Sequence, residues 1–289
     1  MKAFHINIRG FIISAALFVI ALTVACVLAF GTSKNKPDKP GEETSGENGT
    51  DSKHYTTDDF VYKTDITKYM QSLNITGQKY LVLVNKQNPI DENYDTGALV
   101  TLDSDITLYG KEVSLEKCAA DAAAALIAEM RAEGFSGIYV TSGYRSYAYQ
   151  QSLFNSYVSQ ERSEHPTWSD EQIVNEVLSY SAYPGTSEHQ SGLCMDLFVL
   201  PDMTELENFG HETAASGDLG FAETEEYEWL LQNAHKFGFI LRYPEDKTNT
   251  TGYSYESWHY RFVGVDAATK IYQSGQVLEE YCIQHNAIN

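Results

Sequence analysis

One uncharged stretch near the N-terminus, Phe11 to Phe30, divides the chain before any fold is considered. Its length is sufficient for a helix that crosses the hydrocarbon core of a bilayer. Lys2 and Arg9 precede it, and basic residues ahead of a span keep the N-terminus in the cytoplasm and send the following chain outside. We therefore expect residues 1–10 to be cytoplasmic and residues 11–30 to form a single-pass transmembrane anchor in the cell membrane.

Two other interpretations of this stretch place the following domain in the same compartment. Ala25 and Ala29 are suitable small residues before the cleavage point of a signal peptide, which would make the protein secreted. Cys26 would carry the lipid of a lipid-anchored protein, although Thr23 is an unfavourable residue three positions before it. We favour the uncleaved anchor because the apolar run is so long. All three interpretations predict an extracytoplasmic domain.

A change of composition after the apolar run marks where folding begins. Residues 31–53 are rich in Gly, Ser, Thr, Pro, Lys and Glu and lack large apolar side chains, so we expect a disordered linker. One domain is therefore predicted over residues 54–289. Six of the chain's 20 basic and five of its 40 acidic residues precede His54, which leaves this domain a formal charge of −21. Such a surface repels phosphate backbones and argues against nucleic acid as a partner.

Cysteine is sparse in the predicted domain. Cys118, Cys194 and Cys282 are too far apart in sequence for a disulfide framework or a Cys-x-x-Cys metal site. Cys118 falls on the apolar face of a predicted helix, where a small buried thiol is the ordinary interpretation. One disulfide among the three stays open from the sequence, and so does the oligomeric state.

Apolar periodicity predicts a mixed arrangement of strands and helices. No regular βαβ repeat occurs, so we expect an α+β fold with a small sheet and one main core. The helix over residues 114–133 has the clearest signals, with Ser114 as N-cap and Gly134 as the left-handed residue after its end. Strands are expected over residues 80–85, 137–142, 197–200, 239–243 and 260–263, and further helices over 148–157, 169–179, 227–237 and 266–285.

Three residues have the chemistry of metal ligands. His189 and Asp196 are separated by Gly192, which permits a bend, and His259 precedes a predicted strand. Each has an ordinary explanation by itself, because a buried Asp commonly accepts backbone donors and a core His is commonly satisfied. Together, two imidazoles and one carboxylate match the three protein ligands of a catalytic zinc ion, with a fourth position open to water.

Two further charged residues have the chemistry that zinc-dependent hydrolysis requires beside the metal. Glu256 precedes His259 by three positions and is a candidate general base for a zinc-activated water, returning the proton to the leaving amine. Arg145 follows a predicted strand and is a candidate for stabilising the developing oxyanion, a role worth about 3–4 kcal/mol. An alternative for Arg145 is a plain ion pair, which this acidic chain supplies easily.

The motifs resemble those of the VanY-type D-alanyl-D-alanine carboxypeptidases, zinc peptidases of bacterial cell-wall metabolism with related L,D-carboxypeptidases. The resemblance covers about residues 80–264. It rests on Ser142-Gly143-Tyr144-Arg145-Ser146, Ser187-x-His189-x-x-Gly192-x-x-x-Asp196, Glu256-x-Trp258-His259, Leu83-Val84-Asn85-Lys86, Asn233-Ala234-His235-Lys236-Phe237-Gly238-Phe239 and Leu241-Arg242-Tyr243-Pro244.

The resemblance implies a compact domain with Zn²⁺ on a small antiparallel sheet flanked by helices. It also implies removal of the C-terminal D-Ala from peptidoglycan stem peptides. In its terms the zinc ligands are His189, Asp196 and His259, the catalytic residues are Glu256 and Arg145, and the residues that help to bind the substrate are Ser187 and Gln150.

Two alternatives remain beside the D,D-carboxypeptidase. One is an L,D-carboxypeptidase acting on tetrapeptide stems, because the same residues serve both reactions. The other is a non-catalytic wall-binding module with a structural zinc, for which Glu256 would have no use. Cys194 departs from the family, where alanine is usual, and places a sulfur near the expected metal.

Overall fold

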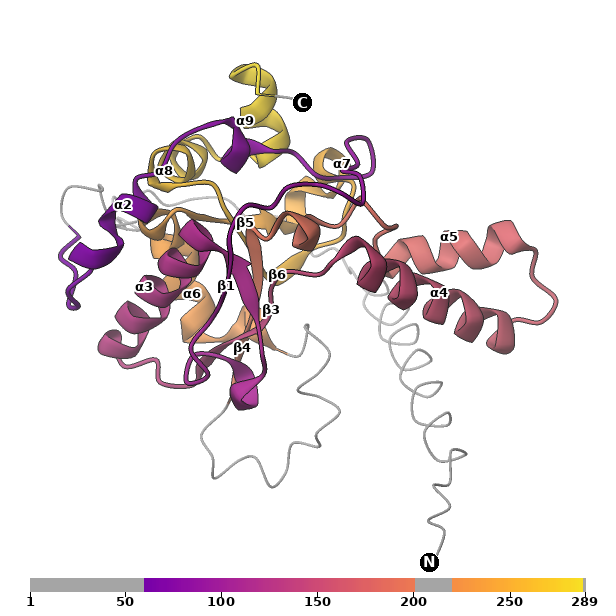
Figure 1. Cartoon of the computed structure of the whole chain (residues 1–289), viewed down its shortest axis with the longest axis horizontal. Coiled ribbons are helices and arrows are strands. Elements are labelled where there is room, and N and C mark those ends of the chain that lie inside the picture. Colours follow the sequence, from indigo (N-terminus) through magenta and orange to yellow (C-terminus); the bar gives the residue numbers. More distant parts are fainter. Residues whose placement is uncertain (1–59, 201–219, 288–289) are drawn as a thin grey trace, which may run out of the picture. The chain divides into compact units, whose positions relative to one another are not determined.

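The computed structural model describes residues 60–200 and 220–287 (Figure 1). The predicted anchor and linker lie outside these residues. Within the two described ranges, no helix combines the length and the apolar character that crossing a membrane requires.

A four-stranded antiparallel sheet organises the domain, in the order β3-β4-β6-β5. This confirms the prediction of a mixed fold with a small sheet. Two strands begin earlier than expected, and the additional residues include Asp196 and His259. The bounds are β3 Ile138–Ser142, β4 Cys194–Val199, β5 Phe239–Tyr243 and β6 Glu256–Phe262.

Side-chain alternation along β4 and β6 separates the core from the site. Met195 and Leu197 of β4 and Tyr260 of β6 point into the larger apolar core. Successive side chains of a strand point to opposite faces. Asp196 and His259 therefore lie on the other face of the sheet.

The strongest predicted helix is present but begins three residues later than expected. α3 spans Lys117–Glu133, and the preceding residues form β2, Ser114–Glu116, which pairs with β1, Leu99–Thr101. The prediction of Ser114 as N-cap is wrong, because the Glu116 carboxylate accepts the hydrogen bond from the Cys118 backbone N–H at 2.8 Å. Gly134 ends the helix with φ of 117°, which confirms the expected stop.

The strand predicted over residues 80–85 is absent. Instead, η3 spans Gln78–Leu81 and irregular backbone follows it. The carbonyl oxygens of Tyr80 and Val82 accept from Nη2 of Arg261, at 3.2 and 2.8 Å. A buried guanidinium thus takes the place that a neighbouring strand would have had.

The remaining helices follow the predictions with shifted bounds. Ser169 begins α5 with a capping box. The helix expected over 266–285 is wrong as a single element, because Gly275, with φ of 64°, ends α8 and a new helix follows. The bounds are α2 Met70–Leu73, α4 Tyr147–Glu164, α5 Asp170–Tyr180, α6 Glu225–Asn233, η8 Ala234–Phe237, α7 Thr248–Thr251, α8 Val265–Ser274 and α9 Leu278–Gln284.

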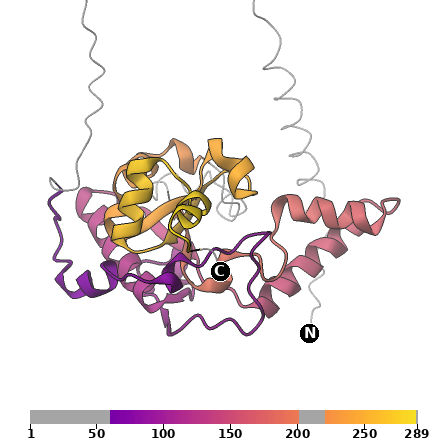
Figure 2. The ribbon, with the colours of Figure 1, turned by 90° about the horizontal axis from the view of Figure 1, so that it is seen from above.

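The helices cover the sheet unequally and leave room for a site. α3 packs on β3, η8 and α2, and α8 packs on β5 and η8. A second apolar cluster lies between Ile240 of β5 and the α8–α9 pair. α4 and α5 pack together as an antiparallel hairpin that projects from the sheet-bearing part (Figures 1 and 2).

Candidate metal and catalytic site

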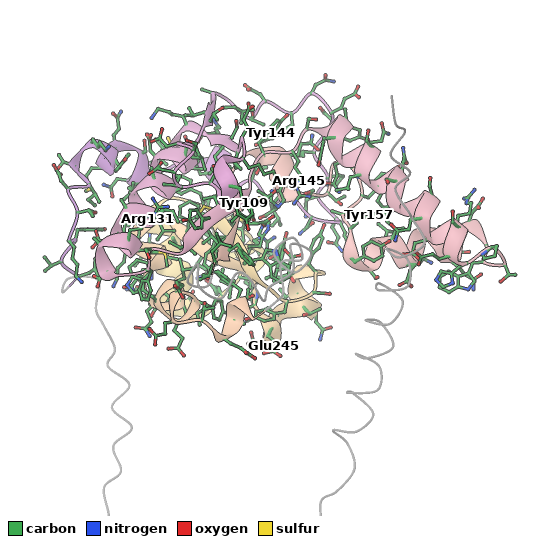
Figure 3. All side chains as sticks on the ribbon, turned by 90° about the horizontal axis from the view of Figure 1, so that it is seen from below. Tyr109, Arg131, Tyr144, Arg145, Tyr157 and Glu245 are labelled. Carbon is green, nitrogen blue, oxygen red and sulfur yellow. The ribbon has the colours of Figure 1, made fainter. Side chains whose placement is uncertain are left out.

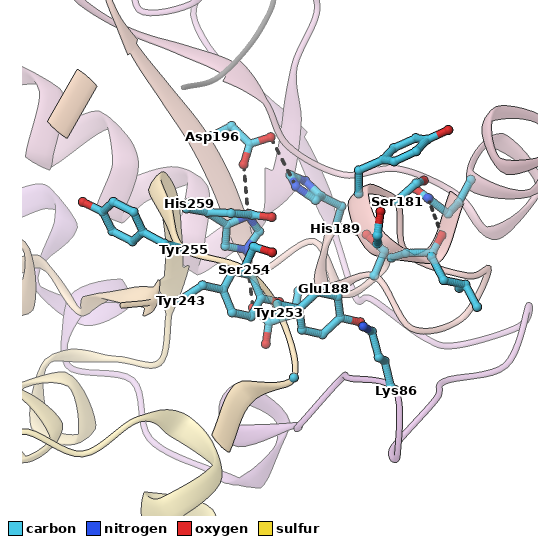
Figure 4. A pocket seen from close by; sticks show the side chains of 18 of the residues that line it. Lys86, Ser181, Glu188, His189, Asp196, Tyr243, Tyr253, Ser254, Tyr255 and His259 are labelled. Atoms are coloured by element: carbon cyan, nitrogen blue, oxygen red, sulfur yellow. Dashed lines mark hydrogen bonds and ion pairs between the residues drawn. The ribbon is translucent and has the colours of Figure 1, made fainter. Parts of the chain in front are cut away.

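The register of β4 against β6 creates the centre of the site. Asp196 stands directly opposite His259, and its Oδ1 lies 3.0 Å from Nδ1 of that histidine. The other carboxylate oxygen, Oδ2, lies 3.3 Å from Nε2 of His189, which η5, Glu188–Ser191, carries (Figure 4). Both histidines are buried. The structure thus brings together the three predicted metal ligands.

The backbone at the exit of β3 fixes the tautomer of His189. Nδ1 of His189 donates to the Gly143 carbonyl oxygen at 2.6 Å, so in the neutral imidazole the lone pair lies on Nε2, the nitrogen next to Asp196. Gly143 is required at this point, because a Cβ there would lie 2.5 Å from the Ser114 carbonyl oxygen. The tight packing of this turn therefore aims one imidazole into the site.

The Asp196 carboxylate lies at about the spacing of neighbouring zinc ligands from each imidazole, with Oδ1 near His259 and Oδ2 near His189. Bonds of about 2.0–2.1 Å place neighbouring N and O ligands about 3.3 Å apart. The observed separations of 3.0 and 3.3 Å from Asp196 to His259 and His189 match this spacing. Two imidazoles and one carboxylate are the ligand types of catalytic zinc, so these residues fit the metal that the sequence predicts.

Cys194 lies next to this set and offers a second combination of ligands. It is fully buried two residues before Asp196 on the same face of β4, and donor atoms of His189, Cys194 and His259 lie within 4.8 Å of one another. Asp196 is the better third ligand of a catalytic zinc ion, because its two oxygens contact the two imidazoles and a carboxylate with two imidazoles is a ligand set of such sites. Burial raises the pKa of the Cys194 thiol and the two histidines lower it, to about 7 overall.

Glu256 and Arg145 both lie close to the proposed metal ligands. Oε2 of Glu256 lies 3.6 Å from Nδ1 of His259, and burial raises the pKa of this carboxyl group despite the nearby imidazole. Nη2 of Arg145 lies 3.5 Å from Oδ2 of Asp196. Arg145 Nη1 also donates to Oε1 of Gln150 at 3.3 Å, and Gln150 in turn donates to the Ala182 carbonyl oxygen at 2.8 Å.

A cavity of about 920 Å³ opens above these groups. Ser187 lines it, together with all the other predicted site residues. The α4–α5 hairpin forms one wall, where the rings of Tyr157 and Tyr180 meet edge to face at 5.4 Å between centroids. Figure 3 shows Arg145 near the base of the hairpin that bears Tyr157. The family resemblance placed Gln150 of α4 at the site, but the tyrosine wall was missed, because nothing in the sequence of α4 or α5 indicates that Tyr157 and Tyr180 border it.

Sequence analysis also missed a buried group of charges beneath the site. Arg242, Arg261, Glu188 and Glu279 are all buried and joined by hydrogen bonds. A signal existed in the sequence, because Arg242 and Arg261 interrupt apolar strands. A charge at such a position requires a buried partner.

In the metal-free protein, burial and the neighbouring negative charges shift the pKa values of the two imidazoles in opposite directions. For His189, burial and Arg145 lower the pKa, while Asp196 and Cys194 raise it, to about 9 overall. For His259 burial again lowers the pKa, yet Cys194, Asp196 and Glu188 raise it well above its usual value. The metal-free site therefore holds protons where a cation would bind, and protons compete with metal.

This competition predicts a pH dependence that differs between the metal-free and zinc-loaded protein. The raised His189 pKa stabilises the metal-free fold fully below pH 6.5, and this stabilisation is lost as pH rises through about 9. The loss amounts to about 3 kcal/mol at most. As pH rises between these values, the midpoint of thermal unfolding of the chelator-treated protein should fall, and the zinc affinity of the protein should rise.

Variants of two histidines serve as the comparison. His189→Gln should flatten the decline in the metal-free protein, whereas His165→Gln, at a half-exposed position on the hairpin, should leave it unchanged. An equal decline in both variants would show that other groups cause it.

Comparisons with known proteins agree with this geometry. The VanY family model, described as D-alanyl-D-alanine carboxypeptidase, matches residues 112–265. The D-alanyl-D-alanine carboxypeptidase of Enterococcus faecalis is 38% identical over 201 residues, which are 70% of this chain and 65% of that protein. The Bacillus subtilis protein YodJ is 32% identical over 284 residues, which are 94% of this chain and 96% of that protein.

Solved structures of similar proteins include ligand and metal complexes. VanYB in complex with D-alanine-D-alanine is 37% identical, with a TM-score of 0.54 over 71% of this chain and 97% of that one. A VanY variant in complex with Zn(II) is 36% identical, with a TM-score of 0.53 over 70% and 98%. The LdcB LD-carboxypeptidase is 30% identical, with a TM-score of 0.58 over 75% and 99%. This chain belongs to the VanY family of D-alanyl-D-alanine carboxypeptidases.

Proposed function

We propose that this protein is a zinc-dependent carboxypeptidase that removes the C-terminal D-Ala from peptidoglycan stem peptides. The observation that carries the proposal is the convergence of His189, Asp196 and His259, with Glu256 beside them, at the floor of one cavity. The relatives support it, since one is named a D-alanyl-D-alanine carboxypeptidase and related structures contain D-alanine-D-alanine or Zn(II).

Three side chains would hold the metal. These are His189 through Nε2, His259 through Nδ1 and Asp196 through its carboxylate, the atoms that face one another in the site. When bound, zinc supplies a Lewis acid that makes water nucleophilic near neutral pH.

Glu256 handles the protons of the reaction. Hydrolysis adds a hydroxyl group to the scissile carbonyl carbon and a proton to the leaving amine. Glu256 takes the proton from water and delivers it to the nitrogen of the departing D-Ala. Burial raises its pKa, which suits a group that must both accept and donate.

Arg145 and its neighbours orient the substrate. The Arg145 guanidinium borders the cavity, and Gln150 holds it on the side away from Asp196. From this position it stabilises the charge that develops on the scissile carbonyl oxygen. Ser187 and Gln150 line the same end of the cavity and help to hold the terminal residue of the peptide.

The likeness to the LdcB LD-carboxypeptidase supports the tetrapeptide stem as a second candidate substrate. The side chains around the scissile bond serve both reactions. The part of the cavity wall that contacts the substrate residue before the scissile bond therefore decides between the two substrates. The third alternative, a non-catalytic wall-binding module, gives no role to the Glu256 carboxylate beside the metal ligands.

We expect the full-length zinc-loaded protein to release D-Ala from a pentapeptide stem ending in D-Ala-D-Ala. Chromatography of the products, with a tetrapeptide stem ending in one D-Ala assayed in parallel, measures the preference. Faster release from the tetrapeptide would replace the D,D assignment with the L,D assignment. Release from neither substrate by protein that contains zinc would refute the carboxypeptidase proposal.

Glu256→Gln should lower kcat by at least about 100-fold, because the variant cannot carry the proton. Zinc content, measured by elemental analysis, should stay the same since Glu256 is not among the proposed ligands. Glu223→Gln, on the surface-exposed segment before α6, is the matched control and should keep full activity. Unchanged turnover in Glu256→Gln would remove Glu256 as the base.

We further propose that residues 11–30 hold the protein in the cell membrane with its domain outside the cytoplasm. The uncharged length of this run and the preceding Lys2 and Arg9 support the proposal. In this location the domain meets peptidoglycan directly.

The anchor predicts that full-length protein sediments with membranes and is extracted by detergent but not by high salt. Added protease should digest the domain on intact cells without a cell wall. Protein recovered from the medium, shortened at its N-terminus, would establish the secreted alternative. Loss of membrane attachment in Cys26→Ala would establish lipid anchoring, because this substitution leaves the apolar run intact.

A further inference from the structure

A neutral set of four buried charges lies directly beneath the metal ligands. Nη1 and Nη2 of Arg242 donate to the Glu279 carboxylate at 2.8 and 2.6 Å. Nε of Arg242 and Nη1 of Arg261 both donate to Oε1 of Glu188, at 2.8 and 2.7 Å. Two guanidinium groups thus offset two carboxylates, so the set can stay ionised away from water.

These contacts occupy only one oxygen of Glu188. Its Oε2 is buried and has no hydrogen-bond partner among the described residues. The same is true of Nε2 of His259. The two atoms lie 3.6 Å apart and face each other. A buried polar atom without a partner destabilises the fold, and each of these atoms is the candidate partner of the other.

The other nitrogen of His259 faces the site. Nδ1 lies 3.0 Å from Asp196 and belongs to the proposed ligand set. A histidine that binds metal through one nitrogen carries its proton on the other, and a hydrogen bond from that N–H fixes the ring. His189 has such an acceptor in the Gly143 carbonyl oxygen. His259 needs one on the side of Nε2.

We propose that Glu188 is a positioning residue that accepts the hydrogen bond from Nε2–H of His259 and so keeps Nδ1 available to the metal. This inference rests on the proposed function, since it assumes metal at His189, Asp196 and His259. Arg242 and Arg261 hold the carboxylate in place through Oε1. Glu188 is not among the proposed metal ligands, although it lines the cavity, and it acts through His259.

The ion pairs alone do not account for the position of Glu188. Glu279 also neutralises a buried arginine, yet it uses both of its oxygens for Arg242 and for Asn85, and it makes no contact with a metal ligand. Glu188 instead leaves one oxygen free, and that oxygen points at a ligand of the site.

A pair of matched substitutions separates positioning from charge neutralisation. In Glu188→Gln the amide oxygen will face the two arginines, because both are donors, and the amide NH₂ will face Nε2 of His259. That NH₂ is a donor and favours the tautomer with its proton on Nδ1, where it blocks the metal. Glu279→Gln removes an equal buried charge from Arg242 without touching His259.

Zinc affinity is measured by competition with a chromophoric chelator on full-length protein. Glu188→Gln should bind zinc about 10- to 100-fold more weakly than the wild type, and Glu279→Gln should bind within a few-fold of it. Similar affinities for Glu188→Gln and wild type would overturn the proposal. Equal weakening in both variants would also overturn it, because general destabilisation would then be the cause.

The tautomer can also be measured in the wild-type protein, which covers the case in which Glu188→Gln does not fold. Nitrogen-15 NMR of the zinc-loaded protein should show His259 protonated on Nε2 and bound through Nδ1, with His189 the reverse. Zinc bound through Nε2 of His259 would refute the positioning role. Wild-type protein that binds no zinc would instead refute the proposed function, and zinc binding without D-Ala release would refute only the reaction.

Discussion

The antiparallel pairing of β4 with β6 is the constraint on which the site depends. This register places Asp196 opposite His259 and lets one carboxylate face two imidazoles. A shift by one residue would turn both side chains into the apolar core on the other face. The register is fixed from that other face, where Met195 and Tyr260 are packed without solvent contact. Side-chain packing on one face of the sheet therefore fixes the positions of the proposed metal ligands on the other face.

Elements outside the sheet complete the site because each is held against it. The turn after β3 supplies the Gly143 carbonyl oxygen to His189 and then directs Arg145 toward Asp196. Beneath the ligands, a neutral set of buried charges connects η5, β5, β6 and α9. The α4–α5 hairpin projects from the sheet-bearing part (Figure 1), and it contributes a wall of the cavity and none of the proposed metal ligands.

Two errors of the sequence-based predictions originate in long-range polar contacts. Residues 80–85 have the composition of a strand, but the carbonyl groups there accept from Arg261. β4 and β6 extend over Asp196 and His259 because these polar residues satisfy each other across the sheet, which a pattern of apolar residues does not reveal. A local feature explains a further error. Gly275 ends α8 in a left-handed conformation, although the periodic spacing of apolar residues continues past it.

The sequence by itself determined the mixed fold class, the strand that leads to Arg145 and the set of candidate residues, because apolar period and residue chemistry are local properties. The motifs were specific enough to indicate the family before any coordinates were considered. Only the tertiary structure decided which nitrogen of each histidine faces Asp196, that Cys194 lies beside the ligands, and that Glu188 lies behind His259. These are relations between residues up to about seventy positions apart, and chain packing alone brings them within a few ångströms.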